Sequence, residues 1–484
     1  MNKPTLFRGI FLLTTANAIF LGSGYVIQVL LGRYFSPEVY GLFGVLIYIV
    51  NILNTIFASG FLEGISRSVA RKPESANTIL RHGLLIELLL SGGIGLVYFL
   101  FSPLLAHIFN QPEITKYIAF SALLIPIYGL RSVYLGLLNG LKEFTAQSLA
   151  IIFAAIVKIG LVALFVYQGH GLVAILIAYF CAALGSLLVG YLYTRVHRQS
   201  NEPSSFKNLG TLALTLSLYA SLLPLLSNID LLFVKSIITD TAAAGYYNAA
   251  TTLARFPQFL LGSFGAALLP FIASDYHAGR IDRSRFIVQH VLKYSILLLV
   301  PIIIISVFSG DQLIQLIYTD AYAPAIHPFM ILIFALCLLS VVQILLTTLI
   351  GIGSERSVVT IVLWAIAVDV VALIVGVNYF GLVGAAWSTL LAALFVFILS
   401  FPLLRKNLQW HTFPKVPILK LILLTGVLSI VAQYLFENPL NHALLLLTYA
   451  FFLVGYVVLL LLSKIITLRE VTSIKSILFR SDIS

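Results

Sequence analysis

The sequence predicts an all-α integral membrane protein, and its composition and the spacing of its apolar runs are the observations that predict it. The chain has 484 residues, of which 60% are apolar and 10% are charged, whereas soluble domains average about 45–50% apolar and about 25% charged residues. Apolar runs of about 20 residues, enough to cross about 30 Å of hydrocarbon, recur along the whole chain. This composition excludes a soluble globular protein, and the high hydropathy excludes an intrinsically disordered one.

About fourteen transmembrane helices are expected from apolar runs that end at polar, glycine or proline residues. The first run, from Ile10 to Leu31, is longer than the roughly 7–15 apolar residues of a cleavable signal peptide, so we expect it to remain as a span. The expected spans are 9–31, 41–64, 82–102, 115–138, 146–167, 172–193, 210–232, 243–270, 287–308, 323–350, 357–377, 382–403, 416–435 and 441–463.

The distribution of positive charge predicts the orientation of these spans. With the N-terminus in the cytoplasm, 22 of the 29 Lys and Arg residues fall in cytoplasmic segments, three fall outside and four lie within spans. Cytoplasmic loops of membrane proteins are enriched in Lys and Arg. We therefore expect a multi-pass protein of the cell inner (cytoplasmic) membrane with both termini in the cytoplasm. The same bias accounts for the net charge of +11 without a nucleic-acid partner.

Three pairs of short motifs indicate an internal repeat. Gly41 matches Gly245, Glu143 matches Glu355, and the segment 171–174 matches 381–384, at offsets of 204 to 212 residues. Two parallel six-helix halves followed by two extra helices are therefore expected, and repeats of this kind occur in secondary transporters. The expected lobes are 1–200 and 201–405, with a linker at 194–208, and residues 406–484 hold two additional helices and a cytoplasmic tail.

Two segments resemble a known family. The segment GRYFSPEVYG at 32–41 and the segment DTAAAGYYN at 240–248 are similar to patterns in the bacterial polysaccharide (O-antigen and exopolysaccharide) flippases of the multidrug/oligosaccharidyl-lipid/polysaccharide exporter superfamily. This resemblance implies a V-shaped, two-lobed carrier that flips an undecaprenyl-pyrophosphate-linked oligosaccharide outward by alternating access. A polysaccharide polymerase and a chain-length regulator are the partners that it suggests, besides membrane lipid. The lipid II flippase of peptidoglycan synthesis is a close relative of this family.

Basic residues inside the spans are the first candidates for a substrate site. Arg131, Lys158, Arg255 and Lys293 lie within or at the edge of spans, where a charge costs at least about 2.5–3.5 kcal/mol on insertion scales. Lys293 lies near a cytoplasmic end and is expected to reach the interface. Guanidinium and ammonium groups match the dense negative charge of a pyrophosphate, so we expect the other three to bind the headgroup. The alternative is that Arg131 pairs with a carboxylate, Glu87 or Glu63.

Polar residues on two equivalent spans extend this candidate site. Span eight carries Arg255 among polar residues at helical spacing, and Pro257 predicts a bend beside it. At the offset of 204, Asn51 and Asn54 of span two occupy the corresponding positions. A polar stripe facing lipid would be costly, so both faces are expected to line an aqueous cleft. The predicted substrate-binding residues are Arg255, Arg131, Lys158, Asn51, Asn54, Asn248, Thr251 and Gln258.

Two intramembrane acids, Asp230 and Asp369, are candidates for ion coupling. A buried carboxylate can hold a coupling proton or Na⁺, and no other cofactor or metal ion is expected. The alternative for Asp230 is an ion pair with Lys235. Glu63 is expected to pair with Arg67 one helical turn later.

Motifs that would indicate other functions are absent from the sequence. It has no phosphate-binding Walker motif, no zinc-ligand spacing, no G-x-S-x-G and no dinucleotide-binding fingerprint. Catalytic residues are therefore not expected. Three alternatives remain open besides the polysaccharide flippase: a lipid II flippase, a drug or cation antiporter of the same superfamily, and a membrane-embedded polysaccharide polymerase or ligase. The basic residues inside the spans favour an anionic cargo over cationic drugs.

Overall fold

The computed structural model describes residues 3–57, 59–196, 221–409, 418–436 and 441–465, and these residues are almost entirely helical. Ten helical stretches among them are long and apolar enough to cross a membrane. The expected all-α membrane fold is therefore confirmed, whereas the number of fourteen spans and the internal repeat stay predictions. Most of the predicted linker, the first half of span seven and most of the cytoplasmic tail lie outside the described residues.

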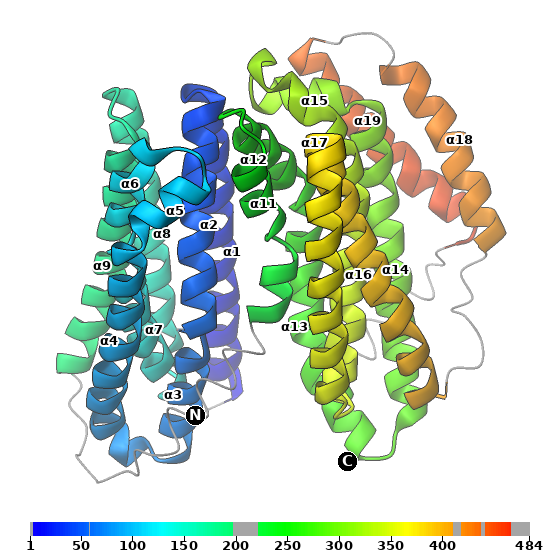
Figure 1. The fold of residues 1–484 in the computed structure, drawn as a ribbon. Helices are drawn as coiled ribbons and strands as arrows, with labels where there is room; N and C mark the ends of the chain where they lie inside the picture. Colours follow the sequence, from blue (N-terminus) through cyan, green and yellow to red (C-terminus); the bar gives the residue numbers. More distant parts are fainter. Residues whose placement is uncertain (1–2, 58, 197–220, 410–417, 437–440, 466–484) are drawn as a thin grey trace. The chain divides into compact units, whose positions relative to one another are not determined.

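The chain divides into two compact units. The first comprises residues 1–252 with 369–385, and the second comprises residues 253–368 with 386–484. The helices of the first unit are α1 (Lys3–Tyr34), α2 (Pro37–Phe57), α3 (Ser59–Arg71), α4 (Ala76–Leu100), α5 (Ser102–Ile108), α6 (Thr115–Ser121), α7 (Leu124–Gly140), α8 (Phe144–Tyr167), α9 (Leu172–Val196), α11 (Asp230–Ile237) and nearly all of α12 (Ala243–Ala254), with the short 3₁₀ helices η1 (Pro73–Ser75) and η2 (Pro112–Ile114) (Figure 1).

Two bundles of neighbouring helices form the first unit. Helix α8 packs along α1 and α9, and α7 packs against α3, α4 and α9. Glycines on one face of α7 allow close approach, because a Cβ on Gly136 would meet the backbone of Leu62 and one on Gly140 would meet that of Ser66. Small residues serve this purpose in membrane helices, where van der Waals packing drives association. Helix α7 therefore packs closely on α3 and also contacts α4 and α9.

The second unit is built around α16. It contains α13 (Phe256–His277), α14 (Ile281–Phe308), α15 (Gly310–Ile317), η3 (Asp320–Ala325), α16 (Ile326–Gly351), α18 (Ile418–Phe436) and α19 (His442–Leu462). Helix α16 packs on α13 and α14, and α14 in turn packs on α18 and α19. The buried side chains of Leu297, Leu428 and Phe452 belong to the apolar core between α14, α18 and α19.

Helix α17 (Glu355–Asn407) reverses direction at Gly381. This residue has a φ of +57°, a left-handed value that glycine adopts readily. The backbones on either side come together, since a Cβ on Gly384 would overlap the carbonyl of Gly376. A straight helix of 53 residues would be about 80 Å long, far more than one crossing. The reversal lies where the sequence predicts the junction between spans eleven and twelve.

Candidate functional site: a basic pair in the first unit

Two basic side chains of the first unit converge on one aromatic ring. Lys158 of α8 places its Nζ 4.4 Å from the centroid of the Phe20 ring on α1, and Arg131 of α7 places its Cζ 5.2 Å from the same centroid. Lys158 also lies 5.3 Å from the ring centroid of Tyr179 on α9. Aromatic faces attract cations, most strongly where water is excluded. The packing of α1, α7, α8 and α9 thus brings together two charges that are 27 residues apart in sequence.

The basic pair, Arg131 and Lys158, is held by neutral partners. Arg131 Nε donates a hydrogen bond to Ser186 Oγ at 2.9 Å, and Lys158 is only 7% exposed. Among the described residues, no carboxylate lies within ion-pair distance of either side chain. The alternative that Arg131 pairs with Glu87 or Glu63 is therefore wrong in this structure. Ser186 and the Phe20 ring stabilise the charge without neutralising it.

Glu63 follows the expected local pairing. Its carboxylate lies 3.4 Å from Arg67 Nη2 one turn later on α3, and both side chains are more than half exposed. This surface pair leaves Glu63 unable to neutralise the basic pair.

The two candidate coupling acids lie near each other in the first unit. Asp230 is buried and accepts hydrogen bonds from the Tyr247 hydroxyl at 2.7 Å and from the Leu231 amide at 2.8 Å. Asp369 is fully buried, and neither of its carboxylate oxygens has a hydrogen-bond partner among the described residues. The two carboxyl groups are close enough for their charges to interact. Two carboxylates in one apolar environment do not both remain charged without a cation.

An ion pair between Asp230 and Lys235 was the alternative for that acid. In this structure the ammonium group of Lys235 points to another partner. Its Nζ donates to Gln111 Oε1 at 2.6 Å, and Asn110 nearby donates to the carbonyl of Ser236 at 3.1 Å. These contacts join the connection after α5 to the end of α11. Burial lowers the pKa of Lys235 below its ordinary value, and the charge of Asp240 opposes that shift.

The predicted polar residues of α12 are packed against α1 and α2. Asn248 Nδ2 lies 3.5 Å from Gln28 Oε1, and Thr252 lies 3.5 Å from the Tyr40 hydroxyl. Thr251 donates to the Tyr247 carbonyl one turn earlier. All three α12 side chains are buried. Asn248 and Thr252 thus contact neighbouring helices, and the predicted part of Asn248 and Thr251 in substrate binding stays a prediction.

The corresponding residues of α2 differ from each other in exposure. Asn51 is exposed, whereas Asn54 is half-buried and its Oδ1 atom has no hydrogen-bond partner among the described residues. Among the described residues, neither Asn51 nor Asn54 contacts Arg131 or Lys158 through a hydrogen bond. Their predicted part in substrate binding stays a prediction.

Arg255 and Gln258 belong to the second unit, and the helix breaks beside them. Helix α12 ends at Ala254, and α13 begins at Phe256 with Pro257 in its first turn. Because proline lacks an amide hydrogen and clashes with the preceding turn, a break at this position is expected. Arg255 is half-buried and its Nε is fully enclosed, while Gln258 is also half-buried. The polar stripe predicted along span eight is therefore divided between two helices.

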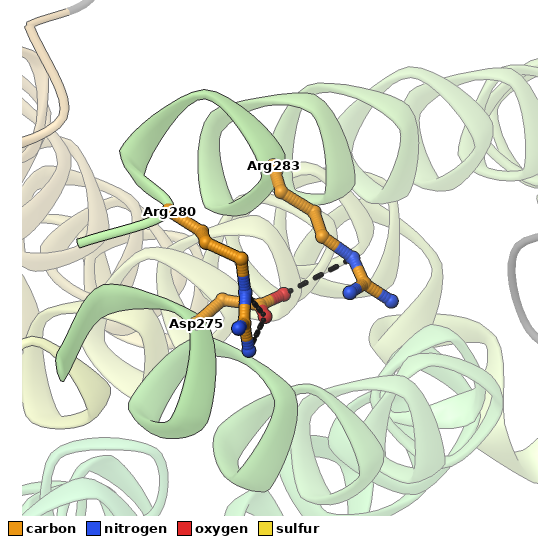
Figure 2. A network of polar contacts seen from close by, with 3 residues as sticks. All are labelled: Asp275, Arg280 and Arg283. Carbon is orange, nitrogen blue, oxygen red and sulfur yellow. Dashed lines mark hydrogen bonds and ion pairs between the residues drawn. The ribbon is translucent and has the colours of Figure 1, made fainter. Parts of the chain in front are cut away.

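Lys293 is largely covered by protein, with 7% of its surface exposed. Its expected extension to the membrane interface stays a prediction. Asp275 at the end of α13 was not singled out by its sequence. Its buried carboxylate binds Arg280 Nη2 at 2.8 Å and Arg283 Nε at 3.4 Å (Figure 2). An acid five and eight residues before the two arginines was the available signal in the sequence.

Comparison with known proteins identifies the family. A family model described as polysaccharide biosynthesis protein matches residues 6–275, which is more than half of the chain. This chain belongs to the polysaccharide biosynthesis protein family. The resemblance noted in the sequence is thereby confirmed.

Two relatives extend this result. Stage V sporulation protein B of Bacillus subtilis is 22% identical over 356 residues, covering 67% of this chain and 68% of that protein. The uncharacterized membrane protein MJ1068 of Methanocaldococcus jannaschii is 24% identical over 204 residues, covering 42% of this chain and 40% of that protein. The chain thus matches less than half of the length of the archaeal relative.

Solved structures show the same fold at low identity. Lipid II flippase MurJ in an inward closed conformation has a TM-score of 0.75 and 15% identity, over 93% of this chain and 98% of that chain. An inward-facing multidrug resistance transporter of the MATE family has a TM-score of 0.70 and 17% identity, over 80% and 96% of the two chains. The chain is therefore a multi-pass membrane protein with the fold of the MOP superfamily.

Proposed function

We propose that this chain is a flippase that carries an undecaprenyl-pyrophosphate-linked oligosaccharide across the cytoplasmic membrane by alternating access, for polysaccharide export. The basic pair is the observation on which the proposal rests, because Arg131 and Lys158 share one ring and no carboxylate of the described residues lies within ion-pair distance of them. Membership of the polysaccharide biosynthesis protein family and the fold of the MOP superfamily support a transporter of such a cargo.

The chemistry of the basic pair suits a pyrophosphate. Arg131 and Lys158 are like charges that repel each other in a medium of low dielectric constant. A diphosphate brings negative charge to both and accepts hydrogen bonds from guanidinium and ammonium donors. Because Lys158 is almost covered in this structure, the headgroup would reach it in a more open conformation. A cationic drug would meet repulsion at the same place, which disfavours a drug antiporter.

Asp230 and Asp369 supply the proposed coupling site. Two close, buried carboxylates favour a bound proton or Na⁺ because either ion removes their mutual repulsion. Tyr247 holds Asp230 in place from α12. Exchange of this ion with the aqueous phases would drive the flipping cycle.

Lipid II is a second candidate cargo. Similarity of fold over 93% of the chain to a structure named lipid II flippase favours it. Lipid II carries a polyprenyl pyrophosphate as well, so the basic pair suits both cargoes. The distinction depends on the glycan and requires direct comparison of the two.

Flipping in proteoliposomes tests both the activity and the cargo. The protein would be reconstituted with undecaprenyl-pyrophosphate-linked oligosaccharide or with lipid II, and flipping measured as exposure of the glycan to a membrane-impermeant oxidant. Arg131→Ala and Lys158→Ala should each slow flipping by about tenfold or more through loss of a charge-assisted contact. Lys116→Ala is the matched control, since Lys116 is an exposed lysine over Tyr117.

Three outcomes separate the possibilities. Faster flipping of the oligosaccharide than of lipid II supports polysaccharide export, and the reverse supports the second cargo. Wild-type rates in Arg131→Ala and Lys158→Ala proteins that are correctly folded would overturn the proposed headgroup site. Loss of ion dependence in Asp369→Asn, with cargo binding retained, would support coupling at the acidic pair, Asp230 and Asp369.

The orientation and the partners need separate experiments. Reporter fusions at both ends of the chain test whether the termini are cytoplasmic, and co-purification tests whether a polymerase or a chain-length regulator binds this protein.

A further inference from the structure

Phe20 on α1 is the aromatic partner that both members of the basic pair share. The centroid of its ring lies 4.4 Å from Lys158 Nζ and 5.2 Å from Arg131 Cζ. The side chain is half-buried and packs against an apolar cluster that includes Ala150 and Ile151 of α8. The face of an aromatic ring carries partial negative charge, so it attracts cations in the way that an anion does, only more weakly.

Helix α9 supplies each cation with a second partner. Ser186 Oγ accepts a hydrogen bond from Arg131 Nε at 2.9 Å, and the ring centroid of Tyr179 lies 5.3 Å from Lys158 Nζ. These two partners are seven residues apart, so they lie on one face of α9, about two turns or about 10 Å apart along it. Because neither contact involves α1, both cations keep a partner on α9 when the Phe20 ring moves away.

Helix α1 is better suited to move than the helix that carries Arg131. Gly22 and Gly24 follow Phe20 on α1, and a Cβ on either would meet no atom of the described residues within 4 Å. Close packing therefore does not require these glycines, and glycine makes a helix easier to deform than alanine does. Helix α7, in contrast, packs on the backbone of α3. Displacement of the ring thus requires less rearrangement than displacement of the guanidinium.

We propose that the Phe20 ring and the cargo diphosphate compete for the basic pair. The ring covers both cations between transport cycles, and the diphosphate displaces it because two charged groups attract guanidinium and ammonium more strongly than one aromatic face. The arrival of the headgroup is thereby coupled to a movement of α1. This competition rests on the proposed function, since it takes Arg131 and Lys158 as the headgroup site.

Farnesyl diphosphate, a soluble polyprenyl diphosphate, tests the competition when it is titrated into the full chain in detergent. A ligand that displaces the ring binds more tightly once the ring holds the cations less well. Phe20→Leu should therefore lower the Kd about tenfold. Phe11→Leu on the same helix is the matched control, because Phe11 is exposed, and it should leave the Kd unchanged. Equal or weaker binding by Phe20→Leu than by wild type would overturn the proposal.

Fluorinated phenylalanines at position 20 separate the charge distribution of the ring from its packing. Each added fluorine withdraws electron density from the face of the ring and weakens its attraction for cations, while the shape of the side chain changes little. Farnesyl diphosphate should bind more tightly as the number of fluorines rises. A role in packing alone predicts no such trend, so a Kd that is independent of the number of fluorines would overturn the competition.

Arg131→Ala distinguishes failure of this inference from failure of the proposed function. If Arg131→Ala weakens the binding of farnesyl diphosphate and fluorination at Phe20 has no effect on it, the headgroup site stands and the role of Phe20 fails. If wild type and Arg131→Ala bind equally, or neither binds, the proposed headgroup site fails and the competition fails with it.

Discussion

Gly41 of α2 and Gly245 of α12 meet backbone to backbone. A Cβ on Gly41 would overlap the amide nitrogen of Gly245, and a Cβ on Gly245 would overlap the carbonyl oxygen of Pro37. These are the two glycines that the sequence pairs as equivalent positions at an offset of 204 residues. A pseudo-twofold axis relating two repeats brings equivalent positions into contact where it passes between them, so this contact agrees with the predicted repeat.

Alanine at either glycine should destabilise this contact. Because the neighbouring atoms are backbone atoms of packed helices, they cannot rotate away, and overpacking of this kind costs about 1–3 kcal/mol. We expect Gly41→Ala and Gly245→Ala to lower the midpoint of thermal unfolding in detergent. Gly93→Ala on α4 is the control, since its Cβ would meet no atom within 4 Å and alanine favours a helix. A midpoint for Gly41→Ala equal to that of Gly93→Ala would contradict the close approach.

Phe20 should stabilise the basic pair through its ring and not merely through its volume. Contacts between a cation and an aromatic face are worth about 0.5–2 kcal/mol, and two cations lie at this ring. Phe20→Leu, which retains most of the apolar volume, should lower the unfolding free energy by about that amount. Phe11→Leu is the control on the same helix, because Phe11 is 65% exposed. Equal effects of the two substitutions would argue against a contribution from the ring.

The contact between Lys235 and Gln111 yields a third prediction. Gln111→Ala would leave a buried ammonium group without this acceptor, and loss of a partner to a buried charged group costs about 1–3 kcal/mol. Thermal unfolding should detect the loss. Glu113→Gln, an exposed neighbour on the same connection, should change the unfolding midpoint little. A neutral result for Gln111→Ala would mean that Lys235 has an equally good acceptor elsewhere.

Asp275 should contribute more to stability than its neighbour Asp282. The Asp275 side chain is 5% exposed and binds two arginines that are about half exposed, whereas Asp282 is 93% exposed and binds Arg285 alone. Asp275→Asn should therefore cost about 1–2 kcal/mol, a value reduced by the solvent around the arginines, and Asp282→Asn less than about 0.5 kcal/mol. Equal losses in urea or thermal unfolding would show that burial of the carboxylate adds nothing.

The local and compositional features of this protein can be predicted from the sequence. Which side chains on different helices contact each other cannot. Apolar runs give the membrane class, Pro257 gives the helix break, and Glu63 and Arg67 pair because helical spacing brings them together. The charges of Arg131 and Lys158 are visible in the sequence, but their common partner Phe20 lies more than 100 residues away. Which of several carboxylates a buried cation reaches depends on the rotation of each helix, and apolar runs do not specify that rotation.

The bond between Tyr247 and Asp230 should reveal whether Asp230 is ionised. A hydrogen bond to an ionised acceptor is about twice as strong as one between neutral groups. Tyr247→Phe removes a donor 2.7 Å from Asp230 Oδ2, whereas the control Tyr456→Phe removes a buried donor 2.6 Å from the neutral carbonyl of Leu297. We expect the unfolding free energy to fall by about 1.5–3 kcal/mol for Tyr247→Phe and by about 0.5–1.5 kcal/mol for Tyr456→Phe. Equal losses would mean that Asp230 accepts as a neutral acid, so that the negative charge of the acidic pair would reside on Asp369.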